Sequence, residues 1–232
     1  DIETLKSCFT YSDINVETNE INQFVLHKER FELQSLFMYL KTVTHQIGFN
    51  NVNFDYVVIH LILKKAETWL DGLGFVYTES EIITEIYQKA QEIIYEQDRV
   101  DFYKTVAISQ KDWKIKQLDL FKMWHYNNKA RGTSLKSLEI SMNYPNVMEM
   151  PILHDRHDIQ LHEIEGILEY NLNDVLATFE FYKRSKEKIE LRATLWQKYN
   201  LYCYNFSDRK IGEQSVLKLY CDRTGKSPFD GK

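Results

Sequence analysis

The stretch HQIGFNNVNFD, residues 45–55, decides the fold that this sequence predicts. Its first half, His45 to Asn50, has the apolar character of a buried strand, and the polar pair Asn50-Asn51 ends it. The run that follows, Phe54 to Leu63, is apolar enough for a strand or a helix, and periodicity alone does not decide between them. Two successive buried elements joined by a polar turn are typical of a layered fold.

The segments on either side extend this pattern. Before residue 45 we expect a short strand that carries Asp1 to Glu3, further strands at Cys8–Ile14 and Ile21–Leu26, and a helix whose apolar face is Leu33, Leu36, Phe37, Leu40 and Val43. After it we expect a helix over Glu79–Asp98, a strand over Ile115–Phe121, a helix capped by Ser134, and helices over Ile164–Lys186 and Lys188–Tyr199. Strands that alternate with helices predict an α/β domain.

The bulk composition excludes several classes of protein. The formal net charge of -5 argues against a strongly basic nucleic-acid-binding domain, although a site that binds cations needs local carboxylates. The three cysteines lack the spacing of a disulfide framework or a zinc knuckle. No apolar run reaches the roughly 20 residues of a membrane span, and no secretory leader opens the chain. We therefore expect no membrane partner and a cytoplasmic location, in the host cell if the protein is viral.

The opening Asp1-Ile2-Glu3 is the first candidate for chemistry. In a strand, residues two positions apart point to the same side, so these carboxylates would lie next to each other. Oxygen ligands of this kind suit Mg²⁺ or Mn²⁺. The competing interpretation is a solvated strand end.

Two further acidic residues have equally ordinary alternatives. Asp55 lies in an apolar run and must be paired or solvated, but an aspartate in the first turn of a helix would also satisfy free N–H groups. Tyr170 and Asp174 share one face of a predicted helix, where a phenol could orient a water beside the carboxylate. Alone, that pair also fits an amphipathic helix.

In combination and order, these residues resemble the DEDD superfamily of 3′-to-5′ exonucleases. The motif D-x-E matches Asp1–Glu3, N-x-x-x-F-D matches Asn50–Asp55, and Y-x-x-x-D matches Tyr170–Asp174. The sequence is most similar to the proofreading domain of family B DNA polymerases of phage or viral type, over roughly residues 1–185. The histidine branch would carry its histidine five residues before the last aspartate, where this chain has Glu169, so the resemblance is to the tyrosine branch, DEDDy.

The resemblance implies an RNase H-like fold with a central mixed sheet flanked by helices. It further implies an exonuclease domain over residues 1–200 with a helical insertion at about 65–104, then a C-terminal helix and linker over 201–232. Two divalent cations, Mg²⁺ or Mn²⁺, would be held by carboxylates. Asp1 would bridge both ions, Glu3 and Asp174 would complete the site of the attacking water, Asp55 would serve the second ion through water, and Tyr170 would orient the attacking water.

The expected activity is hydrolysis of DNA from its 3′ end to nucleoside 5′-monophosphates, on a single-stranded or frayed end. Because the first motif begins at residue 1 without a preceding methionine, we expect a longer protein with a covalently linked polymerase domain. An exoribonuclease of the same superfamily is an alternative, since carboxylates do not distinguish the sugar. A catalytically silent interaction module of the same fold is another.

Contacts with the nucleic acid are expected from two groups of residues: Asn50, Asn51 and Phe54, and Lys129, Arg131 and Lys136. The second group belongs to a basic stretch that also contains Lys122, Trp124, His125 and Tyr126, a mixture that suits a groove for phosphates and bases or an ordinary solvated loop. His154, His157 and His162 could suggest zinc, but the expected hard cations prefer oxygen.

Overall fold

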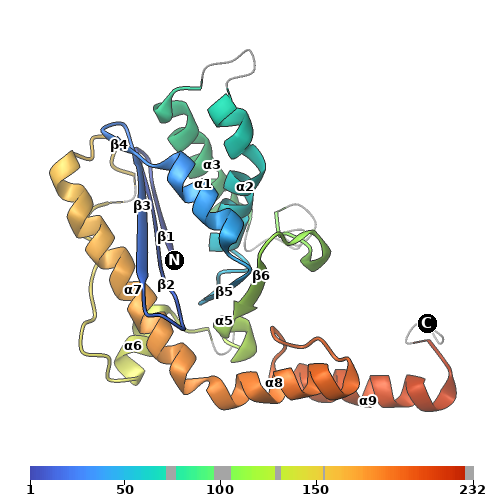
Figure 1. Ribbon diagram of the computed structural model, residues 1–232. Helices are drawn as coiled ribbons and strands as arrows, with labels where there is room; N and C mark the ends of the chain where they lie inside the picture. Colours follow the sequence, from blue (N-terminus) through green and yellow to red (C-terminus); the bar gives the residue numbers. More distant parts are fainter. Residues whose placement is uncertain (72–76, 97–105, 129–131, 154, 228–232) are drawn as a thin grey trace.

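The structure is a computed structural model that describes residues 1–71, 77–96, 106–128, 132–153 and 155–227. Within these ranges the chain forms an α/β protein with two small sheets and several helices (Figure 1). This arrangement confirms the α/β class that the sequence predicts. No helix in the described ranges is both long and apolar enough to cross a lipid bilayer.

The larger sheet is antiparallel, with the strand order β1-β2-β3-β4. Its strands span Ile2–Leu5, Cys8–Ile14, Ile21–His27 and Arg30–Phe31. The pairing of β1 with β2 sets Glu3 opposite Thr10, and the pairing of β2 with β3 sets Thr10 opposite Val25. The three strands expected before residue 45 are therefore confirmed, apart from small differences at their ends.

Helices cover both faces of this sheet (Figure 1). Helices α1 (Leu33–Thr42), α2 (Asp55–Asp71) and α3 (Glu79–Glu96) pack on the face that carries Ile2 and Phe9, in one apolar cluster. Helix α7 (Ile164–Arg184) lies on the other face, and its Ile164, Ile167 and Leu168 pack against Leu5, Cys8 and Val25. The alternation of side chains along each strand supplies the two apolar faces.

The second sheet is a parallel pair, β5 (His45–Gly48) with β6 (Lys116–Asp119), in which Ile47 lies opposite Leu118. The expectation of one central mixed sheet is therefore wrong for the described strands, which are divided between two sheets. A cavity of about 580 Å³ lies between them and is lined by residues of β2 and β5.

Strand β6 ends two residues earlier than the sequence predicts. The Asp119 side chain accepts hydrogen bonds from the backbone N–H groups of Phe121 and Lys122, at 3.0 and 3.3 Å. It therefore caps α5 (Leu120–Met123), so the expected strand over Ile115–Phe121 becomes a strand followed by a helical turn. Side-chain capping of this kind competes with strand pairing, and apolar periodicity does not report it.

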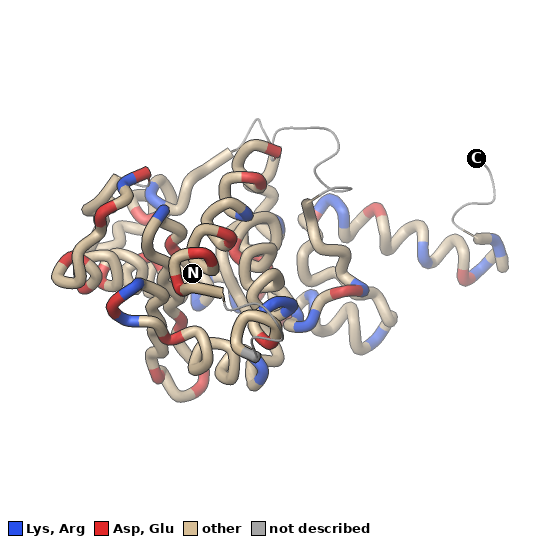
Figure 2. The backbone as a smooth tube through the Cα atoms, turned by 90° about the horizontal axis from the view of Figure 1, so that it is seen from above, with Lys and Arg blue, Asp and Glu red and all other residues tan. Residues whose placement is uncertain are grey.

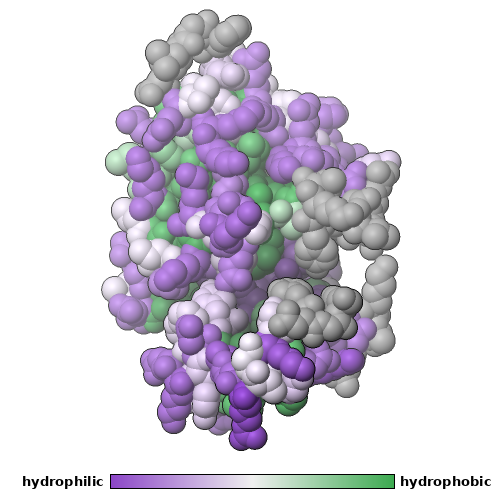
Figure 3. All heavy atoms as spheres, turned by 90° about the vertical axis from the view of Figure 1, so that its right-hand side faces the viewer, coloured by the Kyte–Doolittle hydropathy of each residue, from purple (hydrophilic) through white to green (hydrophobic). Residues whose placement is uncertain are grey.

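The open question about Phe54 to Leu63 is resolved in favour of a helix. Helix α2 begins at Asp55, and the preceding turn is stabilised by a 2.8 Å hydrogen bond from the N–H of Tyr56 to the carbonyl of Asn51. Helix α3 lies in the region interpreted as an insertion, but its Ile82 and Ile86 belong to the same apolar cluster as the sheet. The face of the molecule on the right-hand side of Figure 1 is mostly hydrophilic where it is described, and apolar atoms show between its polar side chains (Figure 3).

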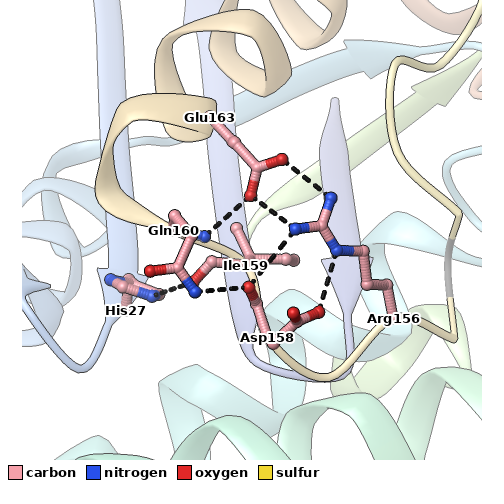
Figure 4. Close-up of polar contacts among 6 residues, drawn as sticks. All are labelled: His27, Arg156, Asp158, Ile159, Gln160 and Glu163. Atoms are coloured by element: carbon pink, nitrogen blue, oxygen red, sulfur yellow. Dashed lines mark hydrogen bonds and ion pairs between the residues drawn. The ribbon is translucent and has the colours of Figure 1, made fainter.

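A polar network fixes the chain just before α7 (Figure 4). The Arg156 guanidinium donates to both carboxylate oxygens of Glu163, at 2.7 and 2.8 Å. The N–H of Gln160 donates to the same carboxylate at 2.9 Å, and Nε2 of the buried His27 ring lies 3.0 Å from the carbonyl of Ile159. Because the network joins this segment to β3, it fixes where α7 begins on the sheet.

The remaining helices are α6 (Leu135–Ser141), α8 (Lys186–Tyr199) and α9 (Asp208–Thr224), with short 3₁₀ turns at Gln110–Asp112 and Leu161–Glu163. The side chain of Ser134 caps α6, as expected. Helices α8 and α9 extend away from the sheets (Figure 1). The segment between them contacts β6, because the Asn205 side chain accepts from the N–H of Asp119 at 2.7 Å and donates to the carbonyl of Gln117 at 3.0 Å.

Candidate functional site

The first motif, Asp1–Glu3, and the third motif, Tyr170–Asp174, lie next to each other at the edge of the larger sheet, where α7 contacts β1. Asp1 precedes β1, Glu3 lies within it, and Asp174 lies in α7. Each of the three side chains offers a carboxylate oxygen, and these oxygens all lie within 4.8 Å of one another. Acidic residues accordingly surround the N-terminus in Figure 2. Residues from the start of the chain and from α7 are thus brought into one group.

Asp55 approaches the same place from the first turn of α2. It is only 8% exposed, and its carboxylate accepts the backbone N–H of Ile2, between the two acidic residues of the first motif. The carboxylate of α2 therefore lies beside the backbone of β1. The Asp55 carboxylate also lies against its own backbone N–H in the first turn of α2, so a role at the helix start is compatible with its place beside Glu3.

The turn before Asp55 is held by residues of β6. The carboxylate of Asp119 accepts from the N–H of Asn50 at 3.0 Å and from that of Val52 at 3.3 Å. The Asn51 side chain donates to Gln117 Oε1 at 2.7 Å. These contacts explain why a polar Asn-Asn pair is compatible with a buried turn.

Gly48 allows the close approach on which this turn depends. A Cβ atom at this position would lie 2.6 Å from Cβ of Asn51, closer than two carbon atoms can approach. Gly48, the last residue of β5, therefore packs directly against the turn, and any side chain at this position would displace Asn51.

Tyr170 lies one helical turn before Asp174 and donates its hydroxyl hydrogen to that carboxylate. Burial and the negative charges of Asp174 and Glu3 raise the pKa of the Tyr170 hydroxyl, so it stays protonated at neutral pH. The spacing predicted from the sequence therefore places a phenol donor against the carboxylate cluster.

The carboxylates are electrostatically coupled. Burial, followed by the charges of Asp174 and Asp55, raises the pKa of Glu3 to about 8. Burial also raises the pKa of Asp174 to about 6, although the hydrogen bond from Tyr170 opposes the shift. Burial raises the pKa of Asp55 as well, against the opposing effects of the terminal ammonium group and backbone N–H groups. Several buried acidic groups at this spacing are costly to ionise together without positive charge nearby.

Sequence reasoning missed three polar neighbours of these carboxylates. Asn171 is fully buried in α7, and its Nδ2 donates to Asp1 Oδ2 at 2.6 Å. Asn173 donates its Nδ2 hydrogen to Oε1 of Glu139 in α6 at 3.4 Å, and its side chain lowers the pKa of Asp174. Asn171 and Asp174 are three residues apart on a helix, and this spacing could have identified the first of them.

Two cavities adjoin the cluster. The acidic cleft, about 700 Å³, includes Asp1, Glu3, Asp55 and Asp174 in its lining. The second cavity, about 580 Å³, lies on the other side of Asp1 and Asp55, between the sheets. The carboxylates are therefore accessible from a cleft large enough for a nucleotide-sized ligand.

The structure separates the residues expected to contact nucleic acid. Asn50 and Phe54 line the acidic cleft, whereas Asn51 is 2% exposed and lines the second cavity. Lys136 lies close enough to lower the pKa of Asp174, and its ammonium forms a 2.6 Å ion pair with Glu149. Lys129 and Arg131 lie outside the described residues.

The aromatic residues of the basic stretch pack inward. Trp124 and Tyr126 contact Phe181 of α7, with ring centroids 5.5 and 6.3 Å apart, and the Trp124 indole donates to Ser185. Burial lowers the pKa of Lys122. These contacts leave Trp124 and Tyr126 half-buried, where the sequence suited either a groove for phosphates and bases or a solvated loop.

The histidines give no support to a zinc site. His157 contacts Lys6, His162 lies in an exposed 3₁₀ turn, and His154 lies outside the described residues. Among the described residues, the one group of three or more candidate metal-ligating side chains consists of carboxylates alone. Such a group suits hard cations such as Mg²⁺ or Mn²⁺ better than zinc.

No family model matches the chain, and comparisons with curated proteins and with solved structures found no similar protein. The functional interpretation therefore depends on the residues and their arrangement.

Proposed function

We propose that this chain is a two-metal-ion 3′-to-5′ exonuclease of the tyrosine branch of the DEDD superfamily. One observation carries the proposal: Asp1, Glu3 and Asp174 bring carboxylate oxygens within 4.8 Å of one another, although the first two lie at the start of the chain and the third lies in α7. Asp55 lies in the lining of the same cleft. Chance matches to three short motifs would not be expected to converge in space.

The donor set fits divalent cations. Asp1, Glu3 and Asp174 would hold one, and Asp1 with Asp55 would hold the other. When bound, such cations activate the attacking water and stabilise the departing 3′ oxygen. Asn171 fixes one oxygen of Asp1 by its 2.6 Å hydrogen bond, which leaves the other oxygen free to turn toward the cleft.

Tyr170 would orient the attacking water, since its hydroxyl lies against Asp174 and remains protonated. Because a neutral phenol cannot act as a base, the carboxylates of the cluster would have to accept the proton of that water. The roles of Tyr170 and Asp174 are therefore distinct, and substitutions can separate them.

The proposal includes an RNase H-like fold, a DNA substrate and a proofreading role in a family B DNA polymerase. A sheet with helices on both faces and a following parallel strand pair support the fold. The motif resemblance supports DNA and proofreading, and the described cleft residues do not distinguish DNA from RNA.

The test is cleavage of a single-stranded DNA that carries a fluorophore at its 5′ end, with Mn²⁺. We expect a ladder that shortens from the 3′ end and release of nucleoside 5′-monophosphates. The substitution Asp174→Ala should lower the rate by about 10³-fold, because it removes part of the charge that stabilises the transition state. Tyr170→Phe should lower it by roughly 100-fold through misplacement of the water.

The matched control is Glu169→Gln, which changes an exposed carboxylate on the same helix. Its rate should stay within about twofold of wild type, as is usual for surface substitutions away from a site. If the wild-type chain cleaved no faster than Asp174→Ala, the proposed function would be wrong. A matched RNA strand, run in parallel, shows which nucleic acid is preferred.

A further inference from the structure

One face of α3 forms part of the acidic cleft. Tyr87, Gln91 and Ile94 line the cleft and are separated by four and three residues, so they form a single stripe along the helix. Tyr87 is partly buried, while Gln91 and Ile94 are exposed. The adjacent stripe of α3, which includes Ile86 and Ala90, is packed into the core.

This position is fixed by the core, since α3 packs against β1, β2 and β3 and against α2. The stripe therefore cannot move independently of the strand that carries Glu3. A rigid helix face beside a reactive centre is suited to holding a substrate in one position.

The chemistry of the cleft lining points to the kind of ligand. Its described residues include five carboxylates and several aromatic or aliphatic side chains, and none of them is Lys or Arg. The ammonium of Lys136, near Asp174, is already paired with Glu149. Phosphate groups would therefore be attracted by bound cations, and the remaining contact surface suits the flat faces of bases.

We propose that α3 is the wall of the cleft on which the last bases of the nucleic-acid strand lie, with Tyr87 stacked on one of them. This inference rests on the proposed function, because the strand end must lie at the carboxylates. On this proposal α3 binds the substrate directly. The affinity for the strand then depends on the bound cations and on stacking of the bases.

The test measures binding instead of cleavage. A 5′-labelled oligothymidylate, whose 3′-terminal linkages resist hydrolysis, is titrated with the chain in Mn²⁺, and fluorescence anisotropy gives the Kd. Tyr87→Ala should raise the Kd by about 5- to 150-fold, which corresponds to the loss of one stacked base. Tyr87→Phe should bind like wild type, because the ring remains.

The matched control on the same helix is Gln88→Ala, an exposed neighbour outside the cleft lining, which should leave the Kd unchanged. A second measurement needs no variant. A strand that lacks its two 3′-terminal bases should bind wild-type protein with the same loss of affinity, and removal of Mn²⁺ with a chelator should abolish binding of either strand.

Equal binding of the complete and abasic strands, or unchanged affinity of a folded Tyr87→Ala variant, would overturn the inference. Strong binding in the chelator would overturn it as well. These failures are distinguishable from failure of the proposed function. If the Tyr87→Ala variant cleaved the strand at the wild-type rate, only the proposed stacking on Tyr87 would be refuted. If binding depended on Tyr87 but no cleavage occurred, only the proposed nuclease activity would be refuted.

Discussion

Asp119 joins three segments through a single side chain. Its carboxylate accepts N–H groups of Asn50 and Val52 in the turn before α2, and those of Phe121 and Lys122 at the start of α5. An amide at this position has one acceptor oxygen where the carboxylate has two, and its NH₂ group would face an N–H donor. The geometry of the turn therefore depends on an acid at position 119.

We expect Asp119→Asn to lower the free energy of unfolding by about 1–3 kcal/mol at pH 7, because a buried donor loses its partner. The effect should depend on pH. Burial raises the pKa of Asp119 from 3.8 to about 6, so the folded chain favours the neutral acid. Ionisation as the pH rises from 3.8 through 6 removes part of the stability that Asp119 contributes, while the N–H bonds to its side chain remain. The stability of wild type relative to the variant should thus fall between pH 4 and 6, by at most about 3 kcal/mol.

Urea unfolding at pH 4, 5, 6 and 7 measures this difference. Asp112→Asn, an exposed acid in the preceding 3₁₀ turn, is the control and should show no such change. A difference that grew with pH would show that the ionised form of Asp119 is the one favoured by folding.

Single residues of the site were predictable where a motif fixes both type and spacing. Asp1, Glu3 and Asp174 are brought together, and Tyr170 contacts Asp174, as the spacing indicates. Asn51 was expected at the nucleic acid, yet its amide is used internally by Gln117. Sequence alone does not show which polar side chain already forms a hydrogen bond with a residue 66 positions away.

At the scale of elements, one buried arginine joins α8 to α9. Arg192 is 0% exposed, and its guanidinium donates to the carbonyls of Lys188 and Phe206, at 2.8 and 2.7 Å, and to Asp208 at 2.9 Å. The first turn of α9 is therefore attached to the preceding helix by charge-assisted hydrogen bonds.

Arg192→Ala should destabilise this pair of helices by about 2–3 kcal/mol, because two carbonyls lose a charged donor. Amide hydrogen exchange should accelerate throughout α9 while the sheet keeps its protection. Arg209→Ala removes an exposed arginine from α9 itself and should change the rate of amide exchange little. Uniform acceleration across the whole chain in Arg192→Ala would contradict a local role.

Element type followed from periodicity where a run was long and one face was apolar, as in α3 and α7. The run after Asp55 left helix and strand equally open, because its inner and outer positions are both apolar and nearly all of them are buried. The end of β6 was missed for another reason. A side chain that caps the next helix acts over three residues, and hydrophobic patterns do not record it.

At the scale of the whole molecule, the carboxylates connect the sheet to helices on both of its sides. Asp1 and Glu3 belong to the sheet edge, Asp55 to α2 on one face and Asp174 to α7 on the other. A cation bound among them would link three layers that are far apart in the unfolded chain. Metal binding is therefore expected to stabilise the fold as a unit.

We expect Mn²⁺ at about 100 times its Kd to stabilise the folded chain by about 2.7 kcal/mol. For a chain of this size the midpoint of thermal unfolding should rise by roughly 5–10 °C. Differential scanning calorimetry with and without the cation measures the shift. Asp174→Ala should lose most of it and Glu169→Gln should retain it, and an equal shift in both would place the cation elsewhere.

The division of the strands into two sheets was beyond sequence reasoning. The pattern of short apolar segments predicts strands without showing their partners, and it does not show the cavity that residues of β2 and β5 line. The class of fold could be predicted from the order of elements, whereas the pairing of strands required their positions in space.

Gly48 constrains how this sequence can change over evolutionary time. The space that a methyl group would need is filled by Asn51, so even alanine would displace the turn that leads to Asp55. Natural variants of this chain should therefore keep glycine at residue 48, including variants in which the apolar residues around it have been exchanged for others of similar size.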